Sequence, residues 1–144
     1  GPYTLSLALR DAPPVPENDA CEAASDLAPG TTAASTLRAE DDLHPSSCTG
    51  QPLSGGDVVY RVHLEAGQKL EATVTPDGWD AALYLLGACS DDACLAASDL
   101  SFVPGGAESV AYTASAAGDY LLVVDSYRAG AAGPFTLSAS VSGP

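Results

Sequence analysis

The chain has 144 residues, enough for one hydrophobic core of ordinary size, whereas two separate domains would each be marginal. Its formal net charge of -14 comes from 19 acidic and five basic residues. Such a field repels phosphate backbones and anionic lipids, which excludes nucleic acids and membrane surfaces as partners. No apolar run approaches the roughly 18 residues of a membrane-spanning helix. With 14 glycines and 11 prolines, the composition favours short strands joined by turns.

The first nine residues, GPYTLSLAL, alternate between apolar and small polar side chains. This period of two predicts a half-buried strand whose apolar face carries Tyr3, Leu5, Leu7 and Leu9. Residues 10–16 follow with three prolines in four positions, a pattern typical of a stiff, extended linker. The first strand is therefore expected to lie away from the domain that spans residues 17–144.

Further strands are predicted along that domain. Residues 21–27, CEAASDL, have room for one short helical turn, capped by Asn18 or Asp19. Residues 120–124 are almost continuously apolar, which indicates a central strand covered on both faces. Short strands separated by turn signals predict an all-β, antiparallel, jelly-roll-like β-sandwich. The expected strands lie within residues 57–67, 68–78, 79–89, 110–113, 120–124 and 135–141.

The four cysteines, Cys21, Cys48, Cys89 and Cys94, are expected to form two disulfides. Zinc is disfavoured because neither His44 nor His63 has ligand-type spacing to them. Four cysteines allow three pairings, and we expect Cys21–Cys48 and Cys89–Cys94, the latter closing a short loop. Disulfides predict an exported protein, extracellular or at the cell surface.

Several stretches together resemble the bacterial pre-peptidase C-terminal (PPC) domain family. They are PENDACEAA (16–24), AEDD (39–42), GGDVVYRVHLEAGQKL (55–70), WDAALYLLGAC (79–89), AAGDYLLVVDSY (116–127) and GPFTLSASV (133–141). The resemblance implies a β-sandwich module of secreted proteins that has no catalytic machinery and that binds, stabilises or links.

The same resemblance implies a calcium site near the start of the domain. The positions that match ligands in calcium-binding relatives are Glu17, Asn18, Asp19, Asp41 and Asp42. Carboxylate and amide oxygens suit calcium. The alternative is that Asn18 and Asp19 cap a turn, while Asp41 and Asp42 are solvated surface charges. Asp80, Asp99 and Asp125 are a second, weaker candidate for an oxygen site at one end of a sheet.

Nothing in the sequence indicates an enzyme. The chain has no Gly-x-Ser-x-Gly motif, and neither histidine is flanked by a plausible nucleophile. Trp79 follows a Pro-Asp-Gly turn, where it is more often packed at the end of a sandwich than exposed to stack on sugars.

Residues 1–9 repeat the pattern of residues 133–141, GPFTLSASV, at an offset of about one domain. The first strand is therefore expected to belong to a neighbouring unit, either a preceding repeat or a separate copy. Such contacts are head-to-tail and do not close, so they generate an open polymer of identical units. The predicted function is a structural repeat of an extracellular bacterial filament; the alternative is a non-catalytic accessory module of a secreted protease or other hydrolase.

Overall fold

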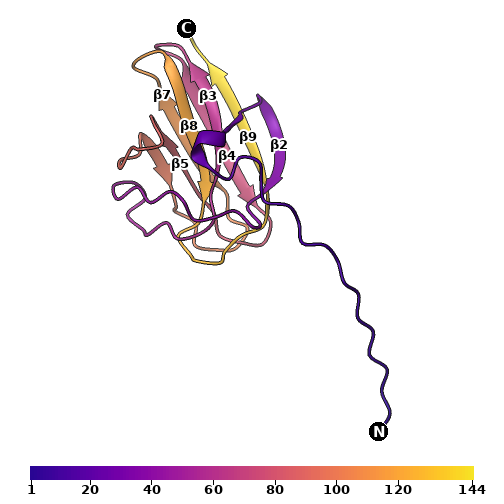
Figure 1. The fold of residues 1–144 in the computed structure, drawn as a ribbon. Helices are drawn as coiled ribbons and strands as arrows, with labels where there is room; N and C mark the ends of the chain where they lie inside the picture. Colours follow the sequence, from indigo (N-terminus) through magenta and orange to yellow (C-terminus); the bar gives the residue numbers. More distant parts are fainter.

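The computed structural model describes residues 1–144 and is a two-sheet β-sandwich (Figure 1). One sheet has five strands in the order β1-β3-β8-β5-β6, and the other has four in the order β2-β9-β4-β7. Neighbouring strands are antiparallel except for β1, which pairs with β3 in parallel. The predicted fold class is confirmed. The strands are β1 (Ser25–Asp26), β2 (Gly30–Ser35), β3 (Val58–Leu64), β4 (Lys69–Pro76), β5 (Ala82–Leu86), β6 (Ala96–Ser98), β7 (Glu108–Thr113), β8 (Gly118–Asp125) and β9 (Pro134–Ser142).

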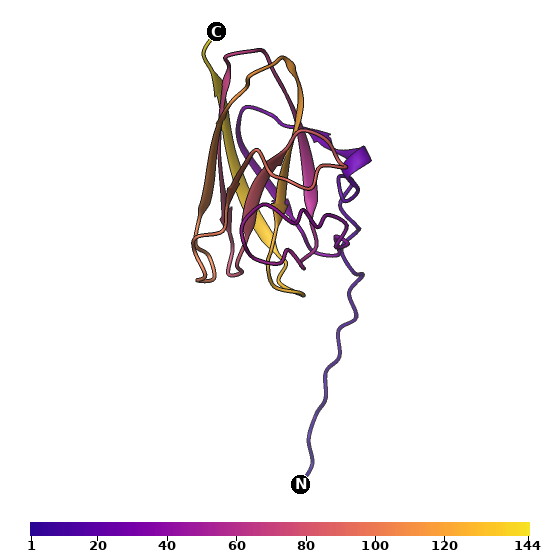
Figure 2. The same cartoon turned by 90° about the vertical axis from the view of Figure 1, so that its left-hand side faces the viewer.

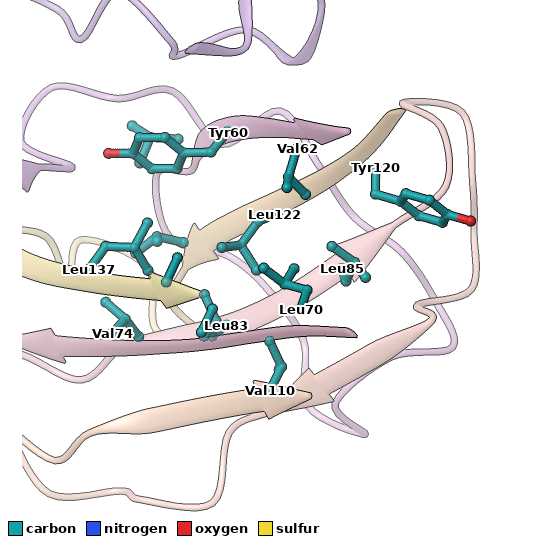
Figure 3. Close-up of a cluster of buried hydrophobic side chains, with 14 of the residues drawn as sticks. Tyr60, Val62, Leu70, Val74, Leu83, Leu85, Val110, Tyr120, Leu122 and Leu137 are labelled. Atoms are coloured by element: carbon teal, nitrogen blue, oxygen red, sulfur yellow. The ribbon is translucent and has the colours of Figure 1, made fainter. Parts of the chain in front are cut away.

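The core lies between the two sheets (Figure 3). In β4 and β9 apolar side chains alternate with polar ones, so each strand buries one face and exposes the other. Leu70 and Val74 of β4 and Leu137 of β9 meet Leu122 of β8 in this layer, and all four are buried. Because the sequence alternation matches the pleat, these strands were predictable.

The outer face of the five-stranded sheet is covered by a second, smaller core. The loop between β2 and β3 and the single-turn 3-10 helix η1 (Cys21–Ala23) supply Leu43, Leu53 and Cys21 to this layer, where they pack on β5 and β8. For this reason all five residues of β5 are buried. In β8, Val123 is buried as well as Leu122 and Val124, so both faces of that strand are covered. The predicted central strand at residues 120–124 is therefore confirmed.

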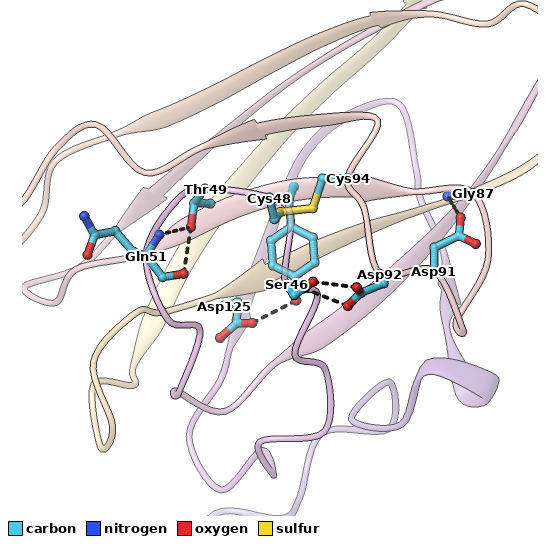
Figure 4. Close-up of a disulfide and its surroundings, with 10 residues drawn as sticks. Ser46, Cys48, Thr49, Gln51, Gly87, Asp91, Asp92, Cys94 and Asp125 are labelled. Carbon is cyan, nitrogen blue, oxygen red and sulfur yellow. Dashed lines mark hydrogen bonds between the residues drawn. A yellow bond between two sulfur atoms is a disulfide. The ribbon is translucent and has the colours of Figure 1, made fainter.

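Two disulfides are present, but the predicted pairing is wrong. The bonds are Cys21–Cys89 and Cys48–Cys94. The loop that carries Cys48 crosses the sheet to reach the loop after β5, where the amide of Cys94 donates to the carbonyl of Ser47 over 3.0 Å. Asp91 holds that second loop by accepting bonds from the amides of Gly87 and Ala88 (Figure 4). Cys89 therefore bonds to Cys21 of η1 and not to Cys94, its near neighbour in sequence.

Residues 1–16 contain no strand within this chain, and in both views they extend away from the sandwich (Figures 1 and 2). Where they approach the domain, Arg38 Nη1 donates a 2.7 Å hydrogen bond to the carbonyl of Pro13. The predicted strand at residues 3–9 requires a partner from another unit, so it stays a prediction.

Candidate functional site

An acidic cluster lies where the chain enters the sandwich. One carboxylate oxygen from each of Asp19, Glu40 and Asp42 lies within 4.8 Å of the other two. Asp19 is half-buried, and the other two are exposed. We call these three residues the entrance cluster. Three like charges this close repel one another unless a cation or protons compensate them.

Backbone contacts hold the entrance cluster in place. Asp19 follows a turn in which its own amide donates to the carbonyl of Pro16, and its Oδ1 accepts a 2.6 Å hydrogen bond from the amide of Glu40. The carbonyl of Glu40 in turn accepts a 3.0 Å hydrogen bond from the amide of Asp57, just before β3. The cluster therefore joins the entering segment to the body of the sandwich.

Asp57 is a buried carboxylate directly behind this cluster. It has no solvent-exposed surface. Its Oδ2 accepts hydrogen bonds from the amides of Asp42 and Leu43, at 2.9 and 3.0 Å, while no group of the protein donates to its Oδ1. Burial raises the pKa of Asp57 to about 7, opposed by the two amide bonds. An unpaired buried oxygen of this kind needs a proton, water or a cation.

Only part of the predicted ligand set converges. Asp19 and Asp42 belong to the entrance cluster, but Glu17 does not. Asn18 is buried, and its amide nitrogen donates a 3.0 Å hydrogen bond to the carbonyl of Val59, so it fixes the fold and does not cap η1. Asp41 lies 3.5 Å from His44. Two of the five predicted ligands, Asp19 and Asp42, therefore converge, and Glu40 joins them.

Sequence reasoning missed Glu40 and Asp57 as site residues. Glu40 lies in the AEDD run that carries the family resemblance, so that run was the available signal. Asp57 immediately precedes an apolar strand, where a charged residue is costly to bury. That position was the signal for Asp57.

The second predicted oxygen site does not form as expected. Both carboxylate oxygens of Asp125 have other partners: its Oδ2 accepts a 2.8 Å hydrogen bond from the hydroxyl of Tyr84, and its Oδ1 accepts one from the amide of Ser126. The neighbouring charge that acts on both Asp80 and Asp99 is Glu108, which the sequence did not single out.

Trp79 packs inside the sandwich, as predicted. It is 6% exposed, its indole nitrogen donates a 2.7 Å hydrogen bond to the carbonyl of Pro134, and its ring meets Phe135 edge-on. The outward face of the four-stranded sheet carries hydroxyl pairs instead of aromatic rings, such as Thr73 with Ser109 at 2.7 Å. No aromatic row for stacking on sugars is present.

The four apolar residues of the amino-terminal segment are almost fully exposed. The exposed fractions of Tyr3, Leu5, Leu7 and Leu9 are 87, 81, 80 and 89%. Exposed apolar side chains that alternate along an extended segment are a pattern suited to strand addition. No segment of this chain covers them.

Comparison with known families decides what kind of domain this is. Residues 58–126, from the start of β3 to the residue after β8, match the family described as bacterial pre-peptidase C-terminal domain. Over these residues the sandwich is PPC-like. The match spans the central strands β3, β8 and β5 together with β4, β6 and β7, so the PPC assignment rests on both sheets.

Two solved structures are similar to this domain, and the first of them shares its fold. The pre-peptidase C-terminal domain of the collagenase from Bacillus anthracis is 18% identical and covers 81% of this chain and 94% of its own, with a TM-score of 0.55. A periplasmic inhibitor of g-type lysozyme, PliG from Aeromonas hydrophila, is 16% identical and covers 79% of this chain and 88% of its own, with a TM-score of 0.49.

No curated protein sequence matches the chain. The structure also contains no helix with the length and apolar character needed to cross a membrane.

Proposed function

We propose that this PPC domain is a non-catalytic module of an exported protein, located outside the cell or at its surface, that links other segments through a calcium-dependent joint. The observation that carries this proposal is the position of the entrance cluster, where Asp19 of the entering segment meets Glu40 and Asp42 of the sandwich. PPC domains are modules of secreted proteases, and the two disulfides agree with an oxidising compartment.

The site chemistry supports binding and not catalysis. Neither histidine is hydrogen-bonded to a hydroxyl group: His63 lies between Asp119 and Glu65, and Nδ1 of His44 donates to the carbonyl of Leu53. All four cysteines are in disulfides. No hydroxyl or thiol therefore has a histidine beside it as general base, which is the arrangement that serine and cysteine hydrolases use.

The residues present fit a calcium ion. Calcium takes about six to eight oxygen ligands, mostly carboxylates, carbonyls and water, and the entrance cluster supplies three carboxylates beside a fourth, Asp57, that retains an unpaired oxygen. A cation held by Asp19, Glu40 and Asp42 would fasten residues 17–19 to the loop before β3. Linkers beyond that point would then leave the sandwich at a fixed angle.

The test is to compare the chain in calcium and in EDTA by small-angle scattering and by thermal unfolding. We expect calcium to raise the melting temperature and to narrow the distribution of tail orientations, and we expect both effects to be lost in Asp19→Asn and Glu40→Gln. Asp11→Asn is the matched control, because Asp11 is an exposed carboxylate in the linker outside the cluster. If EDTA changes neither observable in the wild type, the calcium joint is wrong.

A second candidate function is head-to-tail assembly of copies of this chain, favoured by the exposed apolar alternation of residues 3–9. Strand β9, whose sequence these residues repeat, already lies between β2 and β4. An added strand must therefore use an open sheet edge, and β2 and β7 are the longest strands at an edge.

Assembly is tested by sedimentation and electron microscopy at high protein concentration with calcium present. We expect polymers of the wild type, and we expect Leu5→Asp or Leu7→Asp to abolish them because a charge would enter the apolar face of the added strand. The control Ser6→Asp changes the opposite face. Monodisperse single domains under all these conditions would rule out the filament and leave the linking module.

A further inference from the structure

A second group of acidic residues lies on the sandwich outside the entrance cluster. Asp80 precedes β5, Asp99 follows β6, and Glu108 begins β7. Because β5 and β6 are antiparallel with Leu83 opposite Ser98, the start of β5 and the end of β6 lie at the same end of the sheet. The pairing of Val74 with Glu108 brings the start of β7 to the end of β4, from which the chain leads to Asp80.

The two aspartates are buried and unpaired. Asp80 is 8% exposed and Asp99 5% exposed, and no group of the protein donates a hydrogen bond to any of their four carboxylate oxygens. Leaving one charged oxygen buried without a partner is already costly. Four of the five buried side-chain polar atoms that lack a partner belong to these two aspartates.

Glu108 is fully satisfied and shapes the loop around Asp99. Its carboxylate accepts hydrogen bonds from the hydroxyl of Ser98, from the amide of Leu100 over 3.1 Å and from the amide of Ser101 over 2.6 Å. The groups on both sides of Asp99 in sequence are thereby tied to Glu108. A further bond, from the amide of Gly105 to the carbonyl of Trp79 over 2.8 Å, holds the same loop beside Asp80.

The charges at this end of the sandwich are predominantly negative. Burial first, and then the charges of Asp80 and Glu108, raise the pKa of Asp99 to about 6. Burial and the charge of Glu108 likewise raise the pKa of Asp80, and Arg128 is the one cation that opposes this shift. Three neighbouring carboxylates, of which two have free oxygens, match the oxygen-rich, anionic environment that a hard divalent cation requires.

We propose that Asp80 and Asp99 bind a calcium ion at this end of the sandwich, with Glu108 as the positioning residue that fixes the loop carrying Asp99. Four carboxylate oxygens account for part of the ion's coordination, and water completes it. The ion would tie the loop between β6 and β7 to the start of β5. This site is separate from the entrance cluster and uses none of its residues.

Trp79 makes the site directly observable. It is the only tryptophan in the chain and adjoins Asp80, and terbium, which replaces calcium in oxygen sites, emits strongly when an excited indole lies close to it. The experiment titrates the intact chain with terbium and excites only the indole. We expect sensitised emission that calcium competes away, that survives in Asp42→Asn, and that falls at least about tenfold in Asp99→Asn.

Thermal unfolding supplies the second readout. In EDTA, Asp99→Asn should be at least as stable as the wild type, because the substitution removes a buried charge without a partner. In the Asp42→Asn background, calcium at roughly 100-fold above its Kd should raise the melting temperature by about 5–10 °C, and the additional substitution Asp99→Asn should abolish this rise. The matched control is Asp77→Asn, an exposed carboxylate two residues before Trp79.

Three results would overturn the proposal. The first is sensitised emission that is the same in Asp99→Asn as in the wild type, because the ion would then lie elsewhere. The second is the absence of emission together with a melting temperature that rises when the pH is lowered without any metal. This result would mean that Asp80 and Asp99 share a proton and hold no metal. Loss of emission in Asp42→Asn but not in Asp99→Asn would assign all binding to the entrance cluster.

Discussion

The hydroxyl of Tyr84 donates a 2.8 Å hydrogen bond to Oδ2 of Asp125, and neither side chain has any exposed surface. Tyr84 belongs to β5 and Asp125 ends the neighbouring strand β8. Their bond lies under the layer of loops that covers the five-stranded sheet. Burial raises the pKa of Asp125 to about 8, although the hydrogen bond from the amide of Ser126 acts to lower it.

This pair predicts an unusual dependence of stability on pH. The folded carboxyl of Asp125 retains its proton to about pH 8, whereas the unfolded one releases it near its ordinary pKa of 3.8. The folded state therefore binds more protons between these values, and in EDTA the free energy of unfolding should fall as pH rises. One such group contributes at most about 1.4 kcal/mol per pH unit.

Urea unfolding at several pH values across this window measures the effect. Asp125→Asn keeps an oxygen for Tyr84 but cannot titrate, so its profile should be shallower than that of the wild type. Asp77→Asn, an exposed position, is the control and should leave the slope unchanged. A wild-type free energy that rises through the same window would show that Asp125 is charged in the folded protein.

The disulfide pairing is a second prediction. Peptide mapping without reduction should recover peptides joined through Cys21–Cys89 and Cys48–Cys94. Replacing either pair with alanine should lower the free energy of unfolding by about 2–4 kcal/mol, since each bond closes a long loop in the unfolded chain. Recovery of a peptide that joins Cys21 to Cys48 would contradict the structure.

A third prediction concerns the packing of Trp79. A Cβ atom at Gly133 would lie 2.7 Å from Cδ1 of the Trp79 ring, so Gly133→Ala should overpack this end of the core and cost about 1–3 kcal/mol. The control is Gly118→Ala, where an added Cβ meets no atom within 4 Å. Equal melting temperatures for the two variants would show that the indole is not held there.

A fourth prediction concerns the domain boundary. Deleting residues 1–9 should leave the melting temperature of the isolated chain unchanged, because these residues are exposed and make no hydrogen bond to the sandwich. Deleting residues 1–18 should lower it, because Asn18 would be lost together with its bond to the carbonyl of Val59. A large loss from the shorter deletion would mean that residues 1–9 pack on their own domain.

The strands that local sequence pattern could predict are those that alternate or are continuously apolar, such as β4, β8 and β9. β2 was missed because its residues, GTTAAS, are small and only partly buried, so they carry no clear apolar period. β1 and β6, of two and three residues, are too short to show a period at all.

The candidate sites were less predictable, because they depend on where loops lie. The entrance cluster needs the loop before β3 to approach Asp19, and that position is set by backbone hydrogen bonds to Asp57 and Glu40. The disulfide pairing failed for the same reason, since proximity in sequence favours Cys89–Cys94 while the crossing loop brings Cys48 to Cys94. Asp80 and Asp99 were recognised, but their partner Glu108 is 28 residues from Asp80 in the chain.

The bond between Cys21 and Cys89 also determines how the molecule carries mechanical load. A pull applied to the amino-terminal segment reaches Cys21 and passes through the sulfur bridge to Cys89, just beyond β5. Everything between those two cysteines, from β1 to β5, is shielded from the tension and cannot be drawn out while the bridge is oxidised. Under stretching, the domain therefore has a built-in limit to its extension, and reducing agents would remove that limit.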